Sequence, residues 1–137
     1  MSGTAYVDSS ALLKLVVREP ETAALEADLA GRDGLLASRL AVVECRRAAR
    51  RASDRRVLQV VDEILDAIYL LEVTPAILDA AAVSDPPLLR SLDAIHLATA
   101  LSVGDARMEV ITYDRRLADA VRAHGLIVTQ PGAPEVV

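Results

Sequence analysis

The sequence predicts an α/β protein, a three-layer α/β/α sandwich with a central, mostly parallel sheet of about five strands. Short apolar runs alternate with longer segments of helical periodicity along the chain, which is typical of strands and helices that follow one another. The length of 137 residues and the hydrophobic content of 53% suit a domain with a buried core. No repeat or long linker divides the chain, so we expect a single domain over residues 1–137.

The first part of the chain predicts two strands and two helices. Residues 4–7 form an apolar run that predicts a strand, and two serines then favour the start of a helix over 9–17. A second helix is expected over 20–29 and is opened by Pro20, because proline is tolerated in a first helical turn. A short strand over 35–37 follows a pair of glycines.

The middle of the chain predicts two further helices and a strand. A serine cap precedes a helix over 39–52, and Ser53-Asp54 restarts a helix with apolar residues on one side. The first of these helices carries three residues at helical spacing: Leu40, Val43 and Arg47. Residues 68–73 predict a strand, and Thr74-Pro75 predict the cap and first turn of the next helix.

The last part of the chain predicts two helices and two strands after an Asp-Pro-Pro loop. Ser91 is expected to cap a helix over 92–103 that a glycine closes. A strand over 110–112, a helix over 114–124 and a last strand over 126–128 complete the alternation. This order favours a parallel sheet with helical connections.

Four acidic residues stand where a predicted strand ends or a helix begins: Asp8, Glu44, Asp93 and Asp114. Because the carboxyl ends of parallel strands lie along one edge of a sheet, we expect these carboxylates to meet there. Carboxylates in one place repel one another unless a cation lies between them. Hard oxygen ligands without a Cys/His cluster favour Mg²⁺ or Mn²⁺ over zinc, and one or two such ions could hydrolyse a phosphate ester.

Each carboxylate also has a simpler interpretation. Asp8, Asp93 and Asp114 could cap helices or interact favourably with helix dipoles. Glu44 could pair with an arginine of its own helix, Arg47 or Arg51. Capping does not explain why Glu44 and Asp93 interrupt apolar helical segments, where an inward-facing charge needs a partner.

Charge and composition limit the classes of partner. The formal charge is −5, yet seven of the 14 arginines fall between positions 39 and 56. This basic segment could guide a polyanion, hold an acidic partner, or form a solvated surface. Three tyrosines without Phe or Trp disfavour base stacking as the main binding mode. The chain has no apolar run of the roughly 18 residues that a membrane helix needs, and the single Cys45 excludes an internal disulfide, so we expect a cytoplasmic protein.

Four segments resemble, in order, the motifs of the PIN-domain ribonucleases, especially the VapC toxins of bacterial toxin–antitoxin pairs. They are YVDSSAL at 6–12, SRLAVVE at 38–44, SLDAIHLA at 91–98 and TYD at 112–114. The resemblance spans nearly the whole chain, and the third segment is the most specific. The aromatic residue that often follows the fourth motif is replaced by Leu117, which changes packing but no ligand.

The resemblance implies a PIN-like fold and an endoribonuclease that depends on Mg²⁺ or Mn²⁺. Such an enzyme cleaves RNA, is usually a homodimer, and is neutralised by a cognate VapB-type antitoxin. The catalytic residues and metal ligands it implies are Asp8, Glu44, Asp93 and Asp114, some of them acting through water. Ser9 and Thr112 match hydroxyl positions that support the metal ligands through hydrogen bonds.

Two other functions are considered. A catalytically inactive PIN-like module could bind a protein partner through the arginine stripe over 46–56. A phosphatase of the haloacid-dehalogenase type also places an aspartate after a strand, but it needs a second aspartate where this chain has Ser10.

Of the remaining candidates, His96 and Cys45 are expected to be structural and Asp119 to face solvent. Three cations could contact phosphate but are surface charges by default: Lys14, Arg18 and Arg115.

Overall fold

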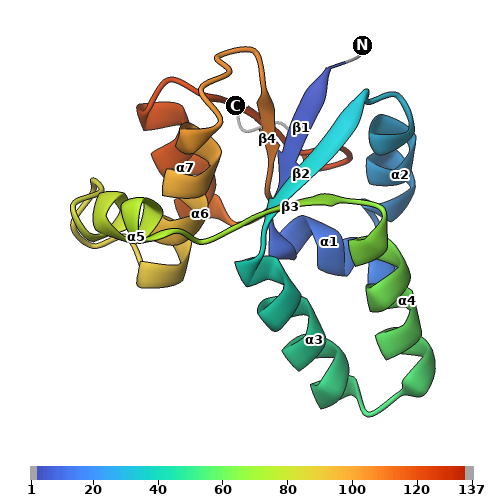
Figure 1. Cartoon of the computed structure of the whole chain (residues 1–137). Helices are drawn as coiled ribbons and strands as arrows, with labels where there is room; N and C mark the ends of the chain where they lie inside the picture. The colour runs from blue at the N-terminus through green and yellow to red at the C-terminus, as the bar shows by residue number, and fades with distance from the viewer. Residues whose placement is uncertain (1–2, 135–137) are drawn as a thin grey trace.

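The protein, described by a computed structural model over residues 3–134, is built on a sheet of five parallel strands. The strands are β1 (Thr4–Val7), β2 (Gly34–Ser38), β3 (Tyr69–Leu71), β4 (Glu109–Ile111) and β5 (Ile127–Thr129), in the spatial order β3-β2-β1-β4-β5. In the registers, Ala5 lies opposite Leu35 on one side and Glu109 on the other. The predicted α/β class and parallel sheet are confirmed (Figure 1).

Helices cover both faces of the sheet. The helices of the first face are α1 (Ser9–Val16), α2 (Thr22–Ala30), α3 (Leu40–Ala52) and α4 (Arg55–Asp66). The second face carries α6 (Ser91–Ser102) and α7 (Arg115–Ala123), and α5 (Pro75–Ala82) packs against α6. The sandwich therefore has the three predicted layers, with α3 and α4 extending beyond the sheet as a helical hairpin (Figure 1).

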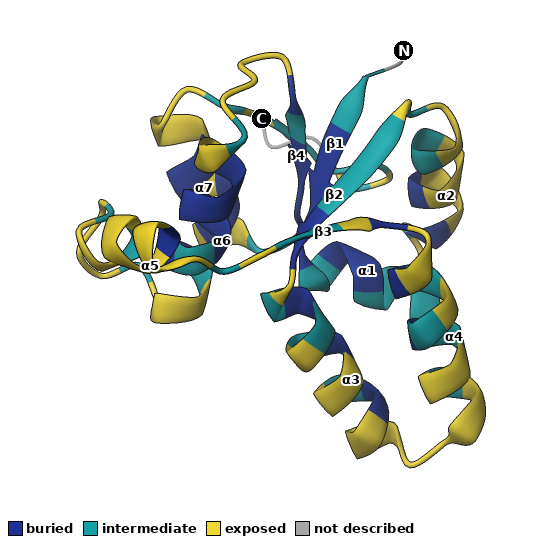
Figure 2. Ribbon diagram, in the orientation of Figure 1, coloured by how far each residue is buried: buried dark blue, intermediate teal, exposed yellow. Residues whose placement is uncertain are grey.

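The strand alternation divides the core into two halves. Ala5 and Val7 of β1 pack with residues of α1 to α4, whereas Tyr6 packs with residues of α6 and α7. Successive side chains of a strand point to opposite faces, so a central strand that is buried on both sides is apolar throughout. Figure 2 shows the dark blue, fully buried residues concentrated in β1 and on the inner sides of the helices.

The predicted serine cap of α3 is wrong, because Arg39 is the cap residue and Ser38, one residue earlier, accepts from Leu40 N at 3.0 Å. Three further local predictions are wrong. The second helix begins at Thr22 rather than Pro20, because the Thr22 hydroxyl accepts from Glu19 N and donates to Lys14 O, which holds Pro20 in the preceding turn. Ser91 is the first residue of α6 and not its cap, which is Arg90.

The third error concerns the apolar stripe of α3. The helix buries Ala41, Cys45 and Ala49, while Val43 is 54% exposed. The small buried side chains allow α3 to pack closely with its neighbours, and they leave Val43 and Arg47 on the outer surface. Thr74 does cap α5 with Pro75 in the first turn, and Asp54 caps α4, as predicted.

Arg32 joins two carboxylates at the amino end of the sheet. Its guanidinium lies 2.9 Å from Asp28 Oδ1 and 2.7 Å from Glu109 Oε2, and its side chain is only 1% exposed. The hydrogen bonds from Arg32, and next from the Thr129 hydroxyl, lower the pKa of Glu109. We call Asp28, Arg32, Glu109 and Thr129 the Arg32 cluster; in it the two carboxylates share one guanidinium.

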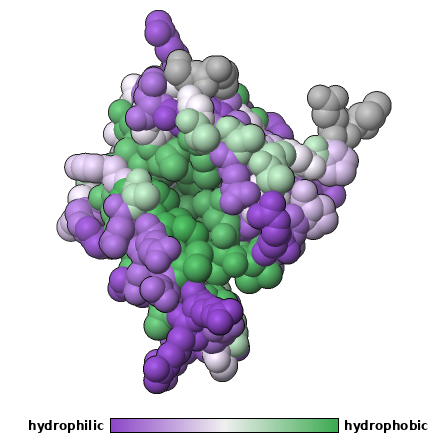
Figure 3. All heavy atoms as spheres, turned by 90° about the vertical axis from the view of Figure 1, so that its right-hand side faces the viewer, coloured by the Kyte–Doolittle hydropathy of each residue, from purple (hydrophilic) through white to green (hydrophobic). Residues whose placement is uncertain are grey.

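The side of the molecule that carries α2 and α4 presents an apolar surface. Figure 3 shows hydrophobic side chains gathered there in one continuous area, bordered by charged residues. Val17, at the end of α1, is 55% exposed. Surfaces of this kind are typical of contact sites for other proteins. Within residues 3–134, no helix combines the length and the apolar character needed to cross a membrane.

Candidate active site at the carboxyl edge of the sheet

The strand order reverses between β1 and β4. From β1 the chain proceeds outward through β2 to β3, and it then returns to place β4 on the other side of β1. In open parallel sheets, ligands bind at such a reversal, beyond the carboxyl ends of the two strands. Asp8 directly follows β1 and Thr112 directly follows β4, so the chain places a carboxylate and a hydroxyl at this point.

Asp8 is buried, with 3% of its surface exposed, and its carboxylate accepts three hydrogen bonds. Its Oδ1 accepts from Ala11 N at 3.1 Å and from the Ser10 hydroxyl at 2.7 Å, and its Oδ2 accepts from the Thr112 hydroxyl at 2.6 Å. Asp8 therefore caps α1 and also faces the end of β4. Burial raises the pKa of this carboxyl group, against the effect of the hydrogen bonds.

Two hydroxyl groups tie the ends of β1 and β4 together. Ser10 Oγ lies 3.3 Å from Thr112 Oγ1 and accepts from Tyr113 N at 3.0 Å. Thr112 Oγ1 also accepts from Asp114 N at 3.1 Å. Thr112 thus contacts Asp8 directly, while its supporting role at a metal site stays a prediction. Ser9 makes no side-chain hydrogen bond within the described chain, and Ser10 is the hydroxyl that sequence reasoning missed.

Glu44 contacts His96 rather than an arginine of its own helix. Glu44 Oε1 lies 2.7 Å from His96 Nε2, and His96 Nδ1 lies 2.7 Å from the Tyr6 hydroxyl. His96 is 2% exposed, so it is buried as expected, but its contact with Glu44 goes beyond a packing role. The two arginines offered as alternative partners, Arg47 and Arg51, form no ion pair with Glu44 among the residues described.

Asp93 and Asp114 come from the first turn of α6 and the cap of α7. Asp114 Oδ1 accepts from Arg116 N at 2.9 Å and Leu117 N at 3.2 Å, so its capping role is real. Burial raises the pKa of Asp93 first, followed by the negative charge of Asp114, with smaller contributions from Asp8 and Glu44. The charges of the other three carboxylates therefore all act on Asp93; we call Asp8, Glu44, Asp93 and Asp114 the acidic edge.

Within residues 3–134, no Lys or Arg forms an ion pair with the acidic edge. Among the described ion pairs, the sole one at the acidic edge is Glu44 with His96. Glu44 Oε2, Asp114 Oδ2 and both oxygens of Asp93 accept no hydrogen bond within residues 3–134. Carboxylate oxygens without partners, next to other carboxylates, match the ligand preference of Mg²⁺ or Mn²⁺.

The side chains are nevertheless not closed around an ion position. No group of three or more His, Cys, Asp and Glu residues in the described part of the chain is arranged closely enough to hold a metal. The donor chemistry thus fits a hard divalent cation, whereas the present spacing requires side-chain rotation to complete a site. Asp93 is partly exposed and accepts no hydrogen bond within residues 3–134, so it has the freedom for such a rotation.

The other candidate residues are engaged elsewhere. Lys14 Nζ lies 2.6 Å from Glu19 and 3.4 Å from Glu21, and it covers the ring of Tyr113 at 4.7 Å. Asp119 is exposed and pairs with Arg122 at 3.7 Å, as expected for a solvent-facing acid. Arg18 pairs with Glu26, Arg115 is exposed, and Cys45 is buried.

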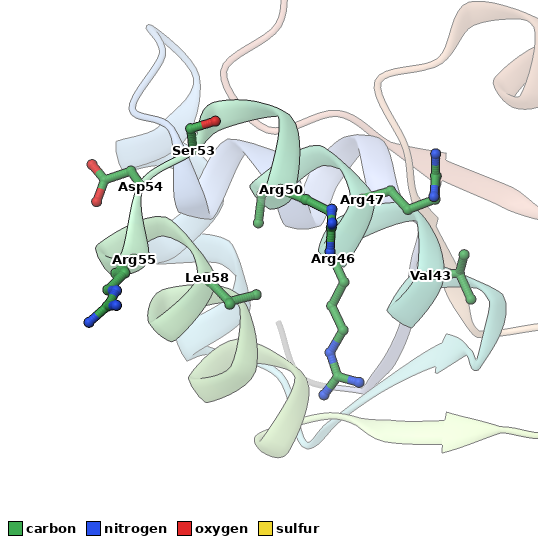
Figure 4. A pocket seen from close by; sticks show the side chains of 9 residues that line it. Val43, Arg46, Arg47, Arg50, Ser53, Asp54, Arg55 and Leu58 are labelled. Atoms are coloured by element: carbon green, nitrogen blue, oxygen red, sulfur yellow. The ribbon is translucent and has the colours of Figure 1, made fainter.

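The arginines of the hairpin form a groove between α3 and α4. Figure 4 shows this groove, which Arg46, Arg47, Arg50 and Arg55 line together with the exposed side chains of Val43 and Leu58. Arg46 is paired with Asp62 at 3.2 Å. Arg47, Arg50 and Arg55 have no ion pair among the described residues, so the groove presents uncompensated positive charge beside apolar surface. We call it the arginine groove.

Comparison with known sequences gives one family. The profile of the family described as PIN domain matches residues 5–123. Ribonuclease VapC46 of Mycobacterium tuberculosis (strain ATCC 25618 / H37Rv) is 42% identical over 132 residues, covering 92% of this chain and 96% of the relative. Ribonuclease VapC47 of M. tuberculosis (strain CDC 1551 / Oshkosh) is 36% identical over 132 residues, with coverages of 93% and 97%.

Solved structures share the fold at low sequence identity. The crystal structure of M. tuberculosis VapC20, described as a Sarcin-Ricin loop cleaving toxin, aligns with a TM-score of 0.71 at 17% identity, over 93% of this chain and 99% of that chain. A toxin–antitoxin complex from Klebsiella pneumoniae aligns with a TM-score of 0.71 at 21% identity, over 93% and 97%. Together with the sequence matches, these structures place the chain in the PIN-domain family, among the ribonucleases named VapC.

Proposed function

We propose that this protein is an endoribonuclease that depends on Mg²⁺ or Mn²⁺ and uses the acidic edge as its active site. The observation that carries the proposal is that the charges of Asp114, Asp8 and Glu44 all act on the Asp93 carboxyl group near the strand reversal, while none of the four pairs with a Lys or Arg among the described residues. Relatives with up to 42% identity over almost their whole length are named ribonucleases, which supports RNA as the substrate. A catalytically inactive module has no need for such a costly arrangement of charge.

Each residue of the acidic edge has a specific part in this proposal. Asp8, Glu44, Asp93 and Asp114 would hold the metal, directly or through water. When bound, the metal would activate a water molecule and stabilise the leaving oxygen of the phosphodiester. Ser10 and Thr112 fix the orientation of Asp8, so this carboxylate is already in place before a ligand arrives. Ser9 remains a predicted supporting residue without a contact that favours it.

The test compares Asp8→Asn with Asp119→Asn. Asp8→Asn removes a charge at the reversal point while keeping the shape, and we expect RNA cleavage to fall by at least about 100-fold, because partners one step further from the metal already contribute about 10–100-fold. Asp119→Asn removes an exposed charge and should cleave RNA at the wild-type rate. Chelation should stop cleavage and added Mn²⁺ should restore it. Cleavage by Asp8→Asn at the wild-type rate would refute the assignment.

We further propose that a VapB-type antitoxin binds and neutralises the protein. The apolar surface over α2 and α4 and the arginine groove support this proposal, because together they suit an amphipathic segment that also carries acidic residues. One structure with the same fold is described as a toxin–antitoxin complex from Klebsiella pneumoniae, and another as VapBC2 of Rickettsia felis bound to a DNA fragment from their promoter. The experiment is to co-express the chain with the product of a short adjacent reading frame and to measure RNA cleavage by the purified complex. Cleavage at the rate of the free protein would contradict neutralisation, and the rival inactive module predicts no cleavage in either sample.

A further inference from the structure

A continuous hydrogen-bonded path leads from the centre of the sheet to Glu44. The hydroxyl of Tyr6, the third residue of β1, lies 2.7 Å from His96 Nδ1, and His96 Nε2 lies 2.7 Å from Glu44 Oε1. Tyr6 is fully buried and His96 is 2% exposed, whereas the Glu44 side chain is 23% exposed. The path therefore starts in the core and ends at the acidic edge.

The chemistry of the three groups fixes the direction of these hydrogen bonds. An ionised carboxylate only accepts, so His96 Nε2 must carry hydrogen and donate to Glu44. The Tyr6 hydroxyl can donate to a neutral Nδ1 or accept from a protonated one, so it satisfies the imidazole in either state. Burial, and next the charge of Asp8, raise the pKa of Tyr6, which keeps the phenol protonated.

Packing alone does not require histidine at this position. The neighbours of His96 on the buried side of α6 are Ala94, Leu97 and Ala98, and a leucine would fill the same space without the desolvation of two ring nitrogens. Both nitrogens have a partner, and the partners come from β1 and α3, two elements that α6 does not adjoin in sequence. The contact holds one oxygen of Glu44 and leaves Oε2 without a hydrogen bond in the described structure.

We propose that His96 is a positioning residue for Glu44: with Tyr6 behind it, it fixes the Glu44 carboxylate so that the second oxygen is directed to a divalent cation. This inference rests on the proposed function, since it assigns Glu44 to a metal site. It also gives the buried Tyr6 hydroxyl a role in metal binding, although Tyr6 lies too deep to reach an ion itself. The imidazole acts through Glu44 and does not contact RNA or metal.

The experiment measures Mn²⁺ affinity by electron paramagnetic resonance of free Mn²⁺, without RNA. His96→Leu removes the donor, and we expect affinity to fall by about 10–100-fold, the range for partners that orient metal ligands. His96→Gln places an amide N–H near the position of Nε2 and should recover most of the affinity. Tyr6→Phe removes only the far hydroxyl and should weaken binding by about tenfold.

Thr99→Val is the matched control. Thr99 is a fully buried residue of the same helix whose hydroxyl donates to Ile95 O at 2.6 Å, away from Glu44. Like Tyr6→Phe, this variant removes a buried hydroxyl group, but its Mn²⁺ affinity should equal that of the wild type. Nitrogen NMR of the metal-free wild type gives a second readout, in which the His96 ring should carry hydrogen on Nε2.

The outcomes separate this inference from the proposed function. If the wild type binds Mn²⁺ and His96→Leu binds it equally well, the positioning role is refuted and the metal site stands. Equal losses in His96→Gln and His96→Leu, or in Thr99→Val, would likewise refute it, because the donor would not be the cause. If His96→Leu does not fold, Tyr6→Phe decides by the same criterion. A wild type that binds no Mn²⁺ overturns both proposals.

Discussion

Carboxyl groups at the two ends of the sheet have pKa values that are shifted in opposite directions. At the amino end, Arg32 contacts both Asp28 and Glu109, and the pKa of Glu109 is lowered. At the carboxyl end, burial raises the pKa of Asp8, and burial followed by the charge of Asp114 raises the pKa of Asp93. Acidic residues thus stabilise the fold at the amino end of the sheet and destabilise it at the carboxyl end.

The difference separates a structural site from a functional one. A carboxylate held by a bidentate arginine has its oxygens engaged in charge-assisted hydrogen bonds, so it has little left to offer a ligand. The acidic edge keeps oxygens without partners, which lowers the stability of the metal-free protein and makes cation binding favourable. The following predictions test this contrast, from the largest expected effect to the smallest.

Replacing Arg32 should cause the largest loss of stability. Arg32→Met introduces an apolar side chain of similar length and leaves Asp28 and Glu109 without a cation. We expect the free energy of unfolding to fall by about 3 kcal/mol, because breaking one partner from a buried ion pair leaves uncompensated charge. Urea unfolding measures this loss. An unchanged midpoint would show that the Arg32 cluster contributes no more than a surface pair.

Divalent metal should stabilise the protein through the acidic edge alone. At a free Mn²⁺ concentration of 100 times the dissociation constant, binding to the folded state adds about 2.7 kcal/mol. Arg32→Met should retain this increment, whereas Asp8→Asn should lose most of it. Thermal unfolding with and without Mn²⁺ provides the measurement, and an equal increment in Asp8→Asn would contradict the assignment of Asp8 to the site.

Neutralising one carboxylate at each end should change stability in opposite directions. Without metal, Asp93→Asn relieves burial of a charge and its repulsion with Asp114, so the free energy of unfolding should rise by about 0.5–2 kcal/mol, the range for single stabilising changes. Asp28→Asn removes a partner of Arg32 and should lower it. Chemical denaturation of both variants measures the sign of each change in the free energy of unfolding. Changes of the same sign would contradict the contrast between the two ends of the sheet.

Glu109 should contribute a small, pH-dependent part of the stability. Its pKa is lowered in the folded state, so its contribution is present above the ordinary pKa of a glutamate and is lost as the pH falls through the lowered value. Glu109→Gln should therefore be less stable than the wild type at neutral pH, by about 1 kcal/mol. The difference should shrink on acidification. Unfolding curves across pH 2–7 check this, since a constant difference would exclude the ion pair as its source.

The fold was largely predictable from the sequence because its signals are local. Short apolar runs with turn residues on both sides gave the five strands, and Thr74 and Asp54 marked true helix starts. The helix start after Pro20 was wrong because it depends on the contact of Thr22 with Lys14 O, which lies eight residues away. Propensity rules do not include such contacts.

The acidic edge was predictable in its location but only partly in its contacts. Asp8 and Asp114 follow strands, so the parallel sheet alone predicts that they approach one another. The link from His96 to Glu44 joins residues 52 positions apart on two helices, and no spacing rule contains it. The choice of Ser10 over Ser9 depends on the rotation of the first turn of α1, which the strand-to-helix junction sets.

The pairing of β1 with β4 has a consequence for biosynthesis. Until Glu109–Ile111 has left the ribosome, β1 can pair only with β2, and Asp8 lacks its bond from Thr112. Domains generally fold as units during translation, the amino-terminal parts emerging first. A nascent chain that ends before β4 therefore holds an incomplete cluster, so a nuclease of this design gains its active site only after Thr112 and Asp114 have been added.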